Sequence, residues 1–351
     1  MNYFHSKWSI SVFLCLVVGV EIAVADEAIV PAGAPLEKLF DGITLTEGVA
    51  VATDGMVYFS DITFSHAAIA EDGSIHAGHI WKFNPRTGKT SIFRSPSGMS
   101  NGIKFNARGD MIICEGADYG GQRVIRTDMK TGMSYIIAGQ YDGRPFNAPN
   151  DVTIDKRGRL YFSDPRYLGH EALEQPVMAV YRIDTDGSVH RIITDAGKPN
   201  GVCVSPDQKT LYVVSNDNGA TAFERLPASD NPVEPGNPLR KGHMALMAYD
   251  LHENGTASFR RTLVDYYPED GPDGLVCDED GNLYVAVRAA NRPGIVVYSP
   301  TGKELDYIKT EVPTNVGFGR GKDANLLYIT AGKSLYRIRI AKKGYHLSAS
   351  H

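Results

Sequence analysis

The sequence predicts an all-β fold, a six-bladed β-propeller with four-stranded blades. The main observation is a hairpin-forming unit of strand, turn and strand that occurs six times along the chain. The second is the glycine content of 36 in 351 residues, about a tenth, above the typical ~7%. Glycine at this level indicates many tight turns, because it adopts positive φ without steric cost.

Each copy of the unit starts with a polar residue, followed by an alternating strand, a turn and a second strand. The third copy, for example, reads NDVTIDKRGRLYFSD. Turn pairs such as Asp54-Gly55 and Asp280-Gly281 separate the two strands and favour a hairpin. The copies begin at Glu47, Asn101, Asn150, Asn200, Asp273 and Asn315.

A second hairpin follows each of the first five copies, as in AVYRIDTDGSVHRII from Ala179. After the sixth copy only SLYRIRI, from Ser334, remains. We therefore expect residues 35–40, near the N-terminus, to supply the missing outer strand and close the ring. Closure removes the exposed edges of an open array. Residues 26–351 are then one propeller domain; a pair of β-sandwiches is the alternative.

The composition excludes several classes of protein. A 42% hydrophobic content supports a large core and argues against general disorder. A net charge of −5 without a Lys/Arg run argues against a nucleic-acid partner. Four cysteines are too few for a disulfide scaffold. Cys114, Cys203 and Cys277 lie in apolar, strand-like runs, so we expect buried free thiols.

Residues 1–25 are expected to be a cleaved secretory signal peptide. Lys7 precedes the apolar stretch from Trp8 to Val20, and Ala23-Val24-Ala25 offers a small-residue cleavage pattern before Asp26. The 13 residues from 8 to 20 are too few to span a bilayer. The sequence thus predicts a periplasmic or secreted protein, without a membrane anchor after cleavage.

The polar residue that starts each unit is a candidate for function. In a propeller these six positions open the innermost strands and converge on one mouth of the central channel. All six side chains carry oxygen, and two are carboxylates, which is the ligand type that hard divalent cations prefer. The alternative is structural, since Asn and Asp also favour turns by bonding their own backbone.

Three long segments carry a resemblance to a known family: NAPNDVTIDKRGRLYFSDPRY (147–167), PNGVCVSPDQKTLYVVSN (199–216) and GPDGLVCDEDGNLYVAV (271–287). Over about residues 35–340 the chain resembles the gluconolactonase, senescence-marker-protein and luciferin-regenerating-enzyme family, which includes regucalcin. The resemblance implies a six-bladed propeller that binds a divalent cation and hydrolyses a sugar lactone to the aldonic acid.

The resemblance also implies a set of site residues. It places the metal ligands at Glu47, Asn150, Asn200 and Asp273, and the general acid/base at Asp273. The implied cofactor is one divalent cation, Ca²⁺ first, with Mg²⁺, Mn²⁺ or Zn²⁺ as alternatives. Asn101 and Asn315 are then left for structure or for substrate binding.

Four further residues are candidates for binding the small-molecule lactone, because they lie at the starts or ends of strands on the same face: Asn101, Glu115, Asp151 and Arg166. For Asp151 a strand-capping role is the equal alternative. In hydrolysis, Asp273 or a loop histidine such as His79 would accept the proton of the attacking water. The rival functions are a paraoxonase-like or other ester and lactone hydrolase on the same propeller, and a non-catalytic metabolite-binding propeller.

Overall fold

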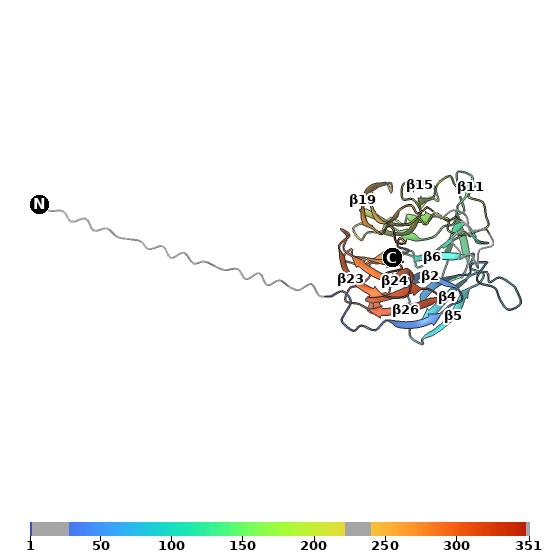
Figure 1. Ribbon diagram of the computed structural model, residues 1–351, viewed down its shortest axis with the longest axis horizontal. Coiled ribbons are helices and arrows are strands. Elements are labelled where there is room, and N and C mark those ends of the chain that lie inside the picture. Colours follow the sequence, from blue (N-terminus) through green and yellow to red (C-terminus); the bar gives the residue numbers. More distant parts are fainter. Residues whose placement is uncertain (2–27, 222–239, 349–351) are drawn as a thin grey trace.

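The computed structural model describes Met1, residues 28–221 and residues 240–348, and it confirms the predicted propeller. Six four-stranded antiparallel sheets are arranged as blades around a central axis (Figure 1). Apart from Met1, the predicted signal peptide lies outside the described residues. In the described ranges no helix has the length and apolar character needed to cross a membrane.

Each of blades one to three is built from four consecutive strands, and their order along the chain is their order from the axis outward. Their bounds are β2 (Leu45–Val51), β3 (Val57–Ile62), β4 (His79–Asn84) and β5 (Lys89–Arg94); β6 (Ser100–Phe105), β7 (Met111–Glu115), β8 (Arg123–Thr127) and β9 (Ser134–Ala138); and β12 (Val152–Ile154), β13 (Leu160–Asp164), β14 (Ala179–Ile183) and β15 (Val189–Ile193). A small two-stranded sheet, β10 (Gln140–Tyr141) with β11 (Arg144–Pro145), lies between blades two and three in the chain.

Blades four and five repeat this order, and blade six takes one strand from the opposite end of the chain. The bounds are β16 (Pro199–Val204), β17 (Thr210–Asn216), β18 (Met244–Leu251) and β19 (Ala257–Asp265); β20 (Leu275–Cys277), β21 (Leu283–Val287), β22 (Gly294–Tyr298) and β23 (Glu304–Lys309); and β24 (Pro313–Phe318), β25 (Leu326–Ala331), β26 (Ser334–Arg339) and β1 (Glu37–Asp41). One short 3-10 helix, η2 (Gly321–Asp323), precedes β25.

The closing strand is β1, as the sequence predicts, although it begins and ends slightly later than residues 35–40. It pairs antiparallel with β26, with Glu37 opposite Arg337 and Asp41 opposite Ser334. The ring of Phe40 packs 4.9 Å from that of Trp81 in blade one, measured between centroids. The closing strand therefore joins the first and last blades through both backbone and side chains.

The core consists of layers between neighbouring blades, because the second strand of each blade is buried on both faces. All five residues of β13 are buried, whereas the outermost strand β19 is mostly exposed. One apolar cluster joins blades one and six through Val49, Phe59 and Tyr328. Equivalent clusters lie between the other neighbouring pairs, so each described blade is packed on both sides.

The two ends of the channel differ in chemistry. The innermost strands begin at the mouth that carries the predicted site residues. They end at the opposite mouth, where Tyr345, His346 and Leu347 of the C-terminal segment line a second cavity.

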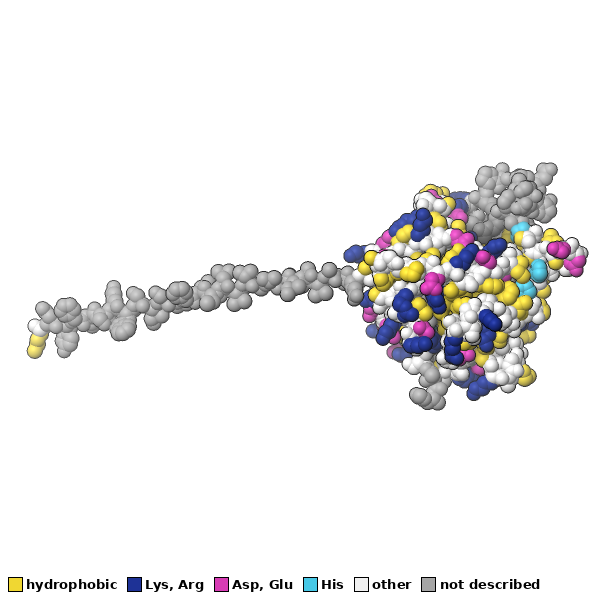
Figure 2. All heavy atoms as spheres, turned by 90° about the horizontal axis from the view of Figure 1, so that it is seen from below, with side chains coloured by type: hydrophobic (Ala, Val, Ile, Leu, Met, Phe, Trp, Pro, Cys, Tyr) yellow, Lys and Arg dark blue, Asp and Glu magenta, His cyan; other side chains and the backbone are white. Residues whose placement is uncertain are grey.

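On the outer surface, Figure 2 shows Lys and Arg side chains interspersed with Asp and Glu over the visible face, without a large area of one charge.

Candidate active site

Five of the predicted residues line a single cavity of about 120 Å³ at the mouth where the innermost strands begin. Glu47, Asn101 and Asn200 lie within β2, β6 and β16, and Asn150 and Asp273 lie two residues before β12 and β20. The complete set of predicted metal ligands is thus brought together, with Asn101 beside it. Each of the five is at least nine-tenths buried.

The glycines that follow Glu47 and Asp273 explain how closely the blades approach. Gly48 has φ +55°, and a Cβ built on it would lie 1.8 Å from the carbonyl oxygen of Asn101 on the next blade. A Cβ on Gly274 would lie 2.3 Å from the amide carbon of Asn315. A side chain at either position would push neighbouring strands apart, so glycine allows the polar residues to meet at the axis.

The carboxylates of Glu47 and Asp273 line the same cavity, and the charge of Asp273 affects the pKa of Glu47. Burial, and then the negative charge of Asp273, raise the pKa of Glu47 well above its usual range. The backbone N–H of Gly48 and the amide of Asn315 donate to Glu47 Oε2 over 2.9 and 3.2 Å, which opposes that rise. Asn315 therefore orients Glu47, which is the structural one of the two roles left open for it. Because burial and a neighbouring negative charge disfavour the ionised form of Glu47, a nearby cation would stabilise that form.

The amide groups add oxygen ligands to this pair. Asn200 donates from Nδ2 to the hydroxyl of Tyr167 over 3.2 Å. This hydrogen bond uses the amide nitrogen of Asn200 and not its amide oxygen. The amide oxygens of Asn101 and Asn216 are buried, and neither accepts a hydrogen bond from the described residues. Both residues line the cavity. Acceptors buried without a donor are costly unless a ligand or ion satisfies them.

This donor set fits a hard divalent cation. Two carboxylates and several amide oxygens at one cavity are what Ca²⁺ takes as ligands. No group of three or more His, Cys, Asp and Glu side chains suited to a metal occurs in the described part of the chain. A cation here would therefore depend on Asn150 and Asn200 as well as on Glu47 and Asp273.

Glu115, predicted as a substrate contact, does not line the cavity. It is fully buried at the end of β7, where its carboxylate accepts from Arg94 over 2.9 Å and from Arg123 over 2.6 Å. Arg123 lies directly opposite it on β8. The ion pair with Arg94 connects blades one and two, and the pair with Arg123 lies within blade two, so Glu115 has a structural role.

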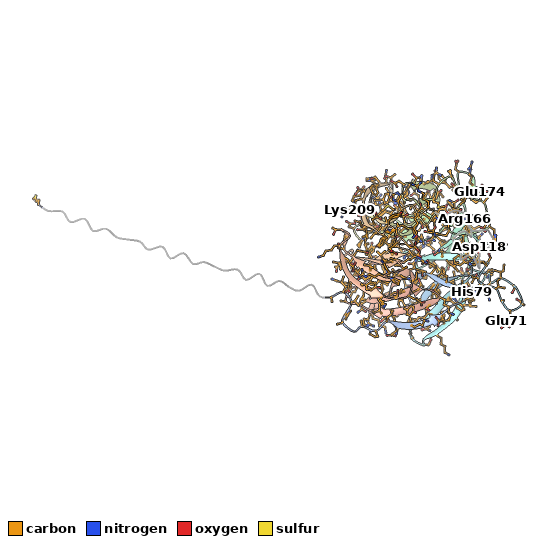
Figure 3. All side chains as sticks on the ribbon, viewed as in Figure 1. Glu71, His79, Asp118, Arg166, Glu174 and Lys209 are labelled. Atoms are coloured by element: carbon orange, nitrogen blue, oxygen red, sulfur yellow. The ribbon has the colours of Figure 1, made fainter. Side chains whose placement is uncertain are left out.

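Arg166 also bonds to backbone carbonyl groups of the protein and does not line the cavity. Its guanidinium donates to the carbonyl oxygens of Asn147 and Glu171 over 3.2 and 2.7 Å. Burial lowers its pKa, while the charge of Glu171 opposes that change. Glu171 in turn accepts from the backbone N–H of Asp118 over 3.0 Å, so Arg166 and Asp118 are linked through it. Figure 3 labels Arg166 and Asp118, which lie near each other in that view.

Asp151 takes the strand-capping role that the sequence left open. Its carboxylate accepts from the backbone N–H of Val152 over 2.9 Å and of Val202 over 3.2 Å, which ties blade three to blade four. It does not line the cavity, and nor does His79, whose Nδ1 lies 2.9 Å from Ser95 Oγ.

Sequence reasoning missed Arg288, which lines the cavity and donates from Nη1 to Asp273 Oδ2 over 2.9 Å. It directly follows β21 in blade five, as Asn216 ends β17 in blade four. A polar residue at the end of a fully apolar second strand was the available signal.

A second missed group lies at the rim, where Asp118 lines the cavity. Its Oδ1 accepts from Ser65 Oγ over 2.8 Å and lies 3.2 Å from His170 Nε2. Ser65 Oγ is 3.1 Å from the same nitrogen of His170. A nucleophilic triad uses the two different ring nitrogens of the histidine. This group therefore connects the loops of blades one, two and three and is not a triad.

Part of the lining of the cavity is apolar. These residues come from blades one to three; they are Leu45, Ile62, Phe64, Met99 and Leu168. The cavity thus offers hydrocarbon surface in addition to its oxygen ligands and a guanidinium.

The chain is similar to several known lactonases. It is 28% identical over 342 residues to a gluconolactonase of Zymomonas mobilis, covering 89% of this chain and 83% of that protein. It is 28% identical over 225 residues to lactonohydrolase oryL of Aspergillus oryzae, covering 62% of this chain and 50% of that enzyme. A lactonase drp35 of Staphylococcus epidermidis is 25% identical over 279 residues, covering 78% of this chain and 72% of that enzyme.

Solved structures share the fold. A gluconolactonase of Xanthomonas campestris superposes with a TM-score of 0.70 at 24% identity, covering 89% of this chain and 91% of that one. The calcium-binding protein regucalcin of Agrobacterium tumefaciens gives a TM-score of 0.65 at 18% identity, covering 93% and 100%. The family model of the SMP-30/Gluconolactonase/LRE-like region matches residues 45–232 and 242–333. The chain therefore belongs to the SMP-30/gluconolactonase/LRE-like family.

Proposed function

We propose that this protein is a divalent-cation-dependent lactone hydrolase with a sugar lactone as substrate. The observation that carries the proposal is the convergence of Glu47, Asp273 and several asparagines on one cavity in a chain whose relatives are named as lactonases. A cavity of about 120 Å³ with buried, unsatisfied acceptors is suited to a small polar ligand.

Glu47, Asn150, Asn200 and Asp273 would hold the cation, for which Ca²⁺ is proposed first and Mg²⁺, Mn²⁺ or Zn²⁺ are alternatives. When bound, such a cation supplies Lewis-acid polarisation of a carbonyl oxygen. The calcium-binding description of the regucalcin relative supports Ca²⁺, as does the all-oxygen donor set.

The chain's own residues would perform the remaining tasks. Asp273 would accept the proton of the attacking water, with Arg288 holding the orientation of its carboxylate. The amide oxygens of Asn101 and Asn216 would accept hydrogen bonds from substrate hydroxyl groups, which would satisfy two buried acceptors at once.

A second substrate class is favoured by the apolar lining residues Ile62, Phe64 and Leu168. A lactone or ester with an alkyl or aryl substituent would bury that substituent there, at about 25 cal/mol per Å² of apolar area. The two classes are distinguished by the ratio of kcat/KM for δ-gluconolactone to that for an alkyl δ-lactone.

The test is acid release from δ-gluconolactone at constant ionic strength, corrected for spontaneous hydrolysis, with and without a chelator. We expect chelation to abolish the enzymatic rate and Ca²⁺ to restore it. Glu47→Gln and Asp273→Asn should lose metal binding and activity together. Asp155→Asn is the matched control, because Asp155 is equally buried but lies in a turn of blade three outside the cavity.

Full activity in Glu47→Gln would falsify the site assignment. Binding of metal and lactone with no turnover of any lactone or ester would instead identify a metabolite-binding propeller. We also propose export after cleavage of residues 1–25, which N-terminal sequencing of the mature chain tests: the expected first residue is Asp26.

A further inference from the structure

Two of the cysteines meet at the channel mouth opposite the candidate active site. Cys203 lies near the end of β16 in blade four, and Cys277 ends β20 in blade five. Both are the innermost strands of their blades, and the two blades are neighbours that share one apolar cluster. The two thiols are therefore held against each other by the packing of adjacent blades.

The sulfur atoms are in contact. Cys203 Sγ and Cys277 Sγ lie 3.6 Å apart, and each lies 3.7 Å from the carbonyl oxygen of Val204. A disulfide requires a separation of about 2.05 Å. The sulfurs would have to approach by about 1.5 Å, a movement on the scale of a side-chain rotation.

The pair lines a cavity at this mouth of the channel. Cys203 and Cys277 both border this second cavity, of about 90 Å³, together with Lys104 and the C-terminal residues Tyr345 and His346. The hydrogen bond with Cys277, and then the charge of Lys104, lower the pKa of the Cys203 thiol against the effect of burial, and the thiolate is the form that attacks an oxidant. The third described cysteine, Cys114, is fully buried in β7 and lines neither of these cavities.

We propose that Cys203 and Cys277 are a redox-sensitive thiol pair that a hydroperoxide converts to a disulfide between blades four and five. The Cys203 or Cys277 thiolate attacks the peroxide O–O bond, which gives a sulfenic acid and releases an alcohol or water. The second thiol then attacks the sulfenic sulfur, forms the S–S bond and releases water. With hydrogen peroxide, two thiols and one oxidant give one disulfide and two waters.

The position of the pair gives the disulfide a mechanical consequence. Asn200 lies near the other end of β16 and Asp273 lies two residues before β20, and the N–H of Gly201 donates to the carbonyl of Asp273 over 3.2 Å. The strands are thus linked at the active-site end by a hydrogen bond, and the disulfide would link them covalently at the other end.

The experiment uses the purified chain, reduced and then treated with a small excess of hydrogen peroxide. We expect the intact mass to fall by about 2 Da, the mass of two hydrogens, and to recover with dithiothreitol. Non-reducing peptide mapping should find the peptides of residues 203 and 277 joined. Cys114→Ser should behave like the wild type, whereas Cys203→Ala and Cys277→Ala should not lose this mass.

Three results would overturn the proposal: both thiols remain open to alkylation after oxidation, a sulfinic or sulfonic acid forms without a cross-link, or the cross-link involves Cys114. Mapping of the wild-type protein decides among these even if a cysteine variant does not fold.

Discussion

Arg288 donates hydrogen bonds from one nitrogen to two acceptors, Oδ2 of Asp273 over 2.9 Å and the carbonyl oxygen of Pro313 over 3.3 Å. The second bond fixes the guanidinium against blade six, and the first fixes the carboxylate of Asp273 against the guanidinium. Arg288 therefore determines how a proposed metal ligand and proton acceptor faces the cavity.

Replacing Arg288 should weaken metal binding and catalysis without removing a metal ligand. We expect Arg288→Gln to lower metal affinity and kcat/KM by about 10- to 100-fold, the usual effect of losing a partner that orients a ligand. Calorimetric titration with Ca²⁺ and lactone kinetics measure the two quantities. Arg292→Gln is the control, since Arg292 in the same blade pairs with Glu304 at the surface and should leave both unchanged. Unaltered affinity in Arg288→Gln would contradict the orienting role.

Glu115→Gln should reduce stability and leave metal affinity intact, because Glu115 bonds Arg94 and Arg123 away from the cavity. The carboxylate is fully buried, but the arginines are 24% and 35% exposed. We therefore expect a loss of about 2 kcal/mol in the free energy of unfolding, below the 3–5 for a fully buried pair. Urea unfolding measures it, with the exposed Glu304→Gln as a control expected to cost less than about 1 kcal/mol. A selective loss of lactone affinity would instead restore Glu115 as a substrate contact.

His346 should make the protein less stable in mild acid. Burial, and then the charges of Arg320 and Lys104, lower the pKa of His346 to about 4, against about 6.5 in an unfolded chain. The unfolded state therefore binds more protons between these values, and stability is lost as the pH falls from 6.5 towards 4.

At pH 5 this linkage corresponds to about 1–2 kcal/mol relative to pH 7.5, and His346→Gln should remove it. Urea unfolding of both proteins at the two pH values provides the measurement, and the difference between them cancels the shared contribution of the carboxylates. Identical pH dependence in the two proteins would show that His346 does not titrate in this way.

The closing strand should be needed for stability. A chain that begins at residue 42 lacks β1, so β26 becomes an open edge and Trp81 loses its contact with Phe40. We expect the Tm to fall by about 10 °C or more and self-association to increase. Thermal unfolding and light scattering measure these changes. Lys38→Ala, an exposed change in β1, should stay within about 0.5 kcal/mol of the wild type. A truncated chain with an unchanged Tm would show that closure contributes little.

The sequence was most informative where the repeat determined geometry. Because each unit places its first residue at the same end of an innermost strand, Glu47, Asn150, Asn200 and Asp273 could be predicted to converge. The strand β1 could be predicted from a missing partner. Periodicity and strand order are local properties, and closure follows from counting strands.

Side-chain partners could not be predicted in the same way. Glu115 and Arg288 both lie at the ends of second strands, yet Arg288 reaches the cavity while Glu115 turns to Arg94 and Arg123. The direction of such a side chain depends on the charged and polar groups of the neighbouring blade. Arg94, in the outermost strand of blade one, is 21 residues from Glu115, and no pattern in the sequence pairs them.

The closure of the ring also constrains how the chain is assembled during synthesis. Glu37 of β1 pairs with Arg337 of β26, 300 residues further along. A nascent chain can form the hairpins of early blades as they emerge, but its first strand has no partner until β26 has been made. Closure of the ring therefore waits until β26 has been synthesised, and a nascent chain that lacks β26 exposes the unpaired faces of its terminal blades to aggregation.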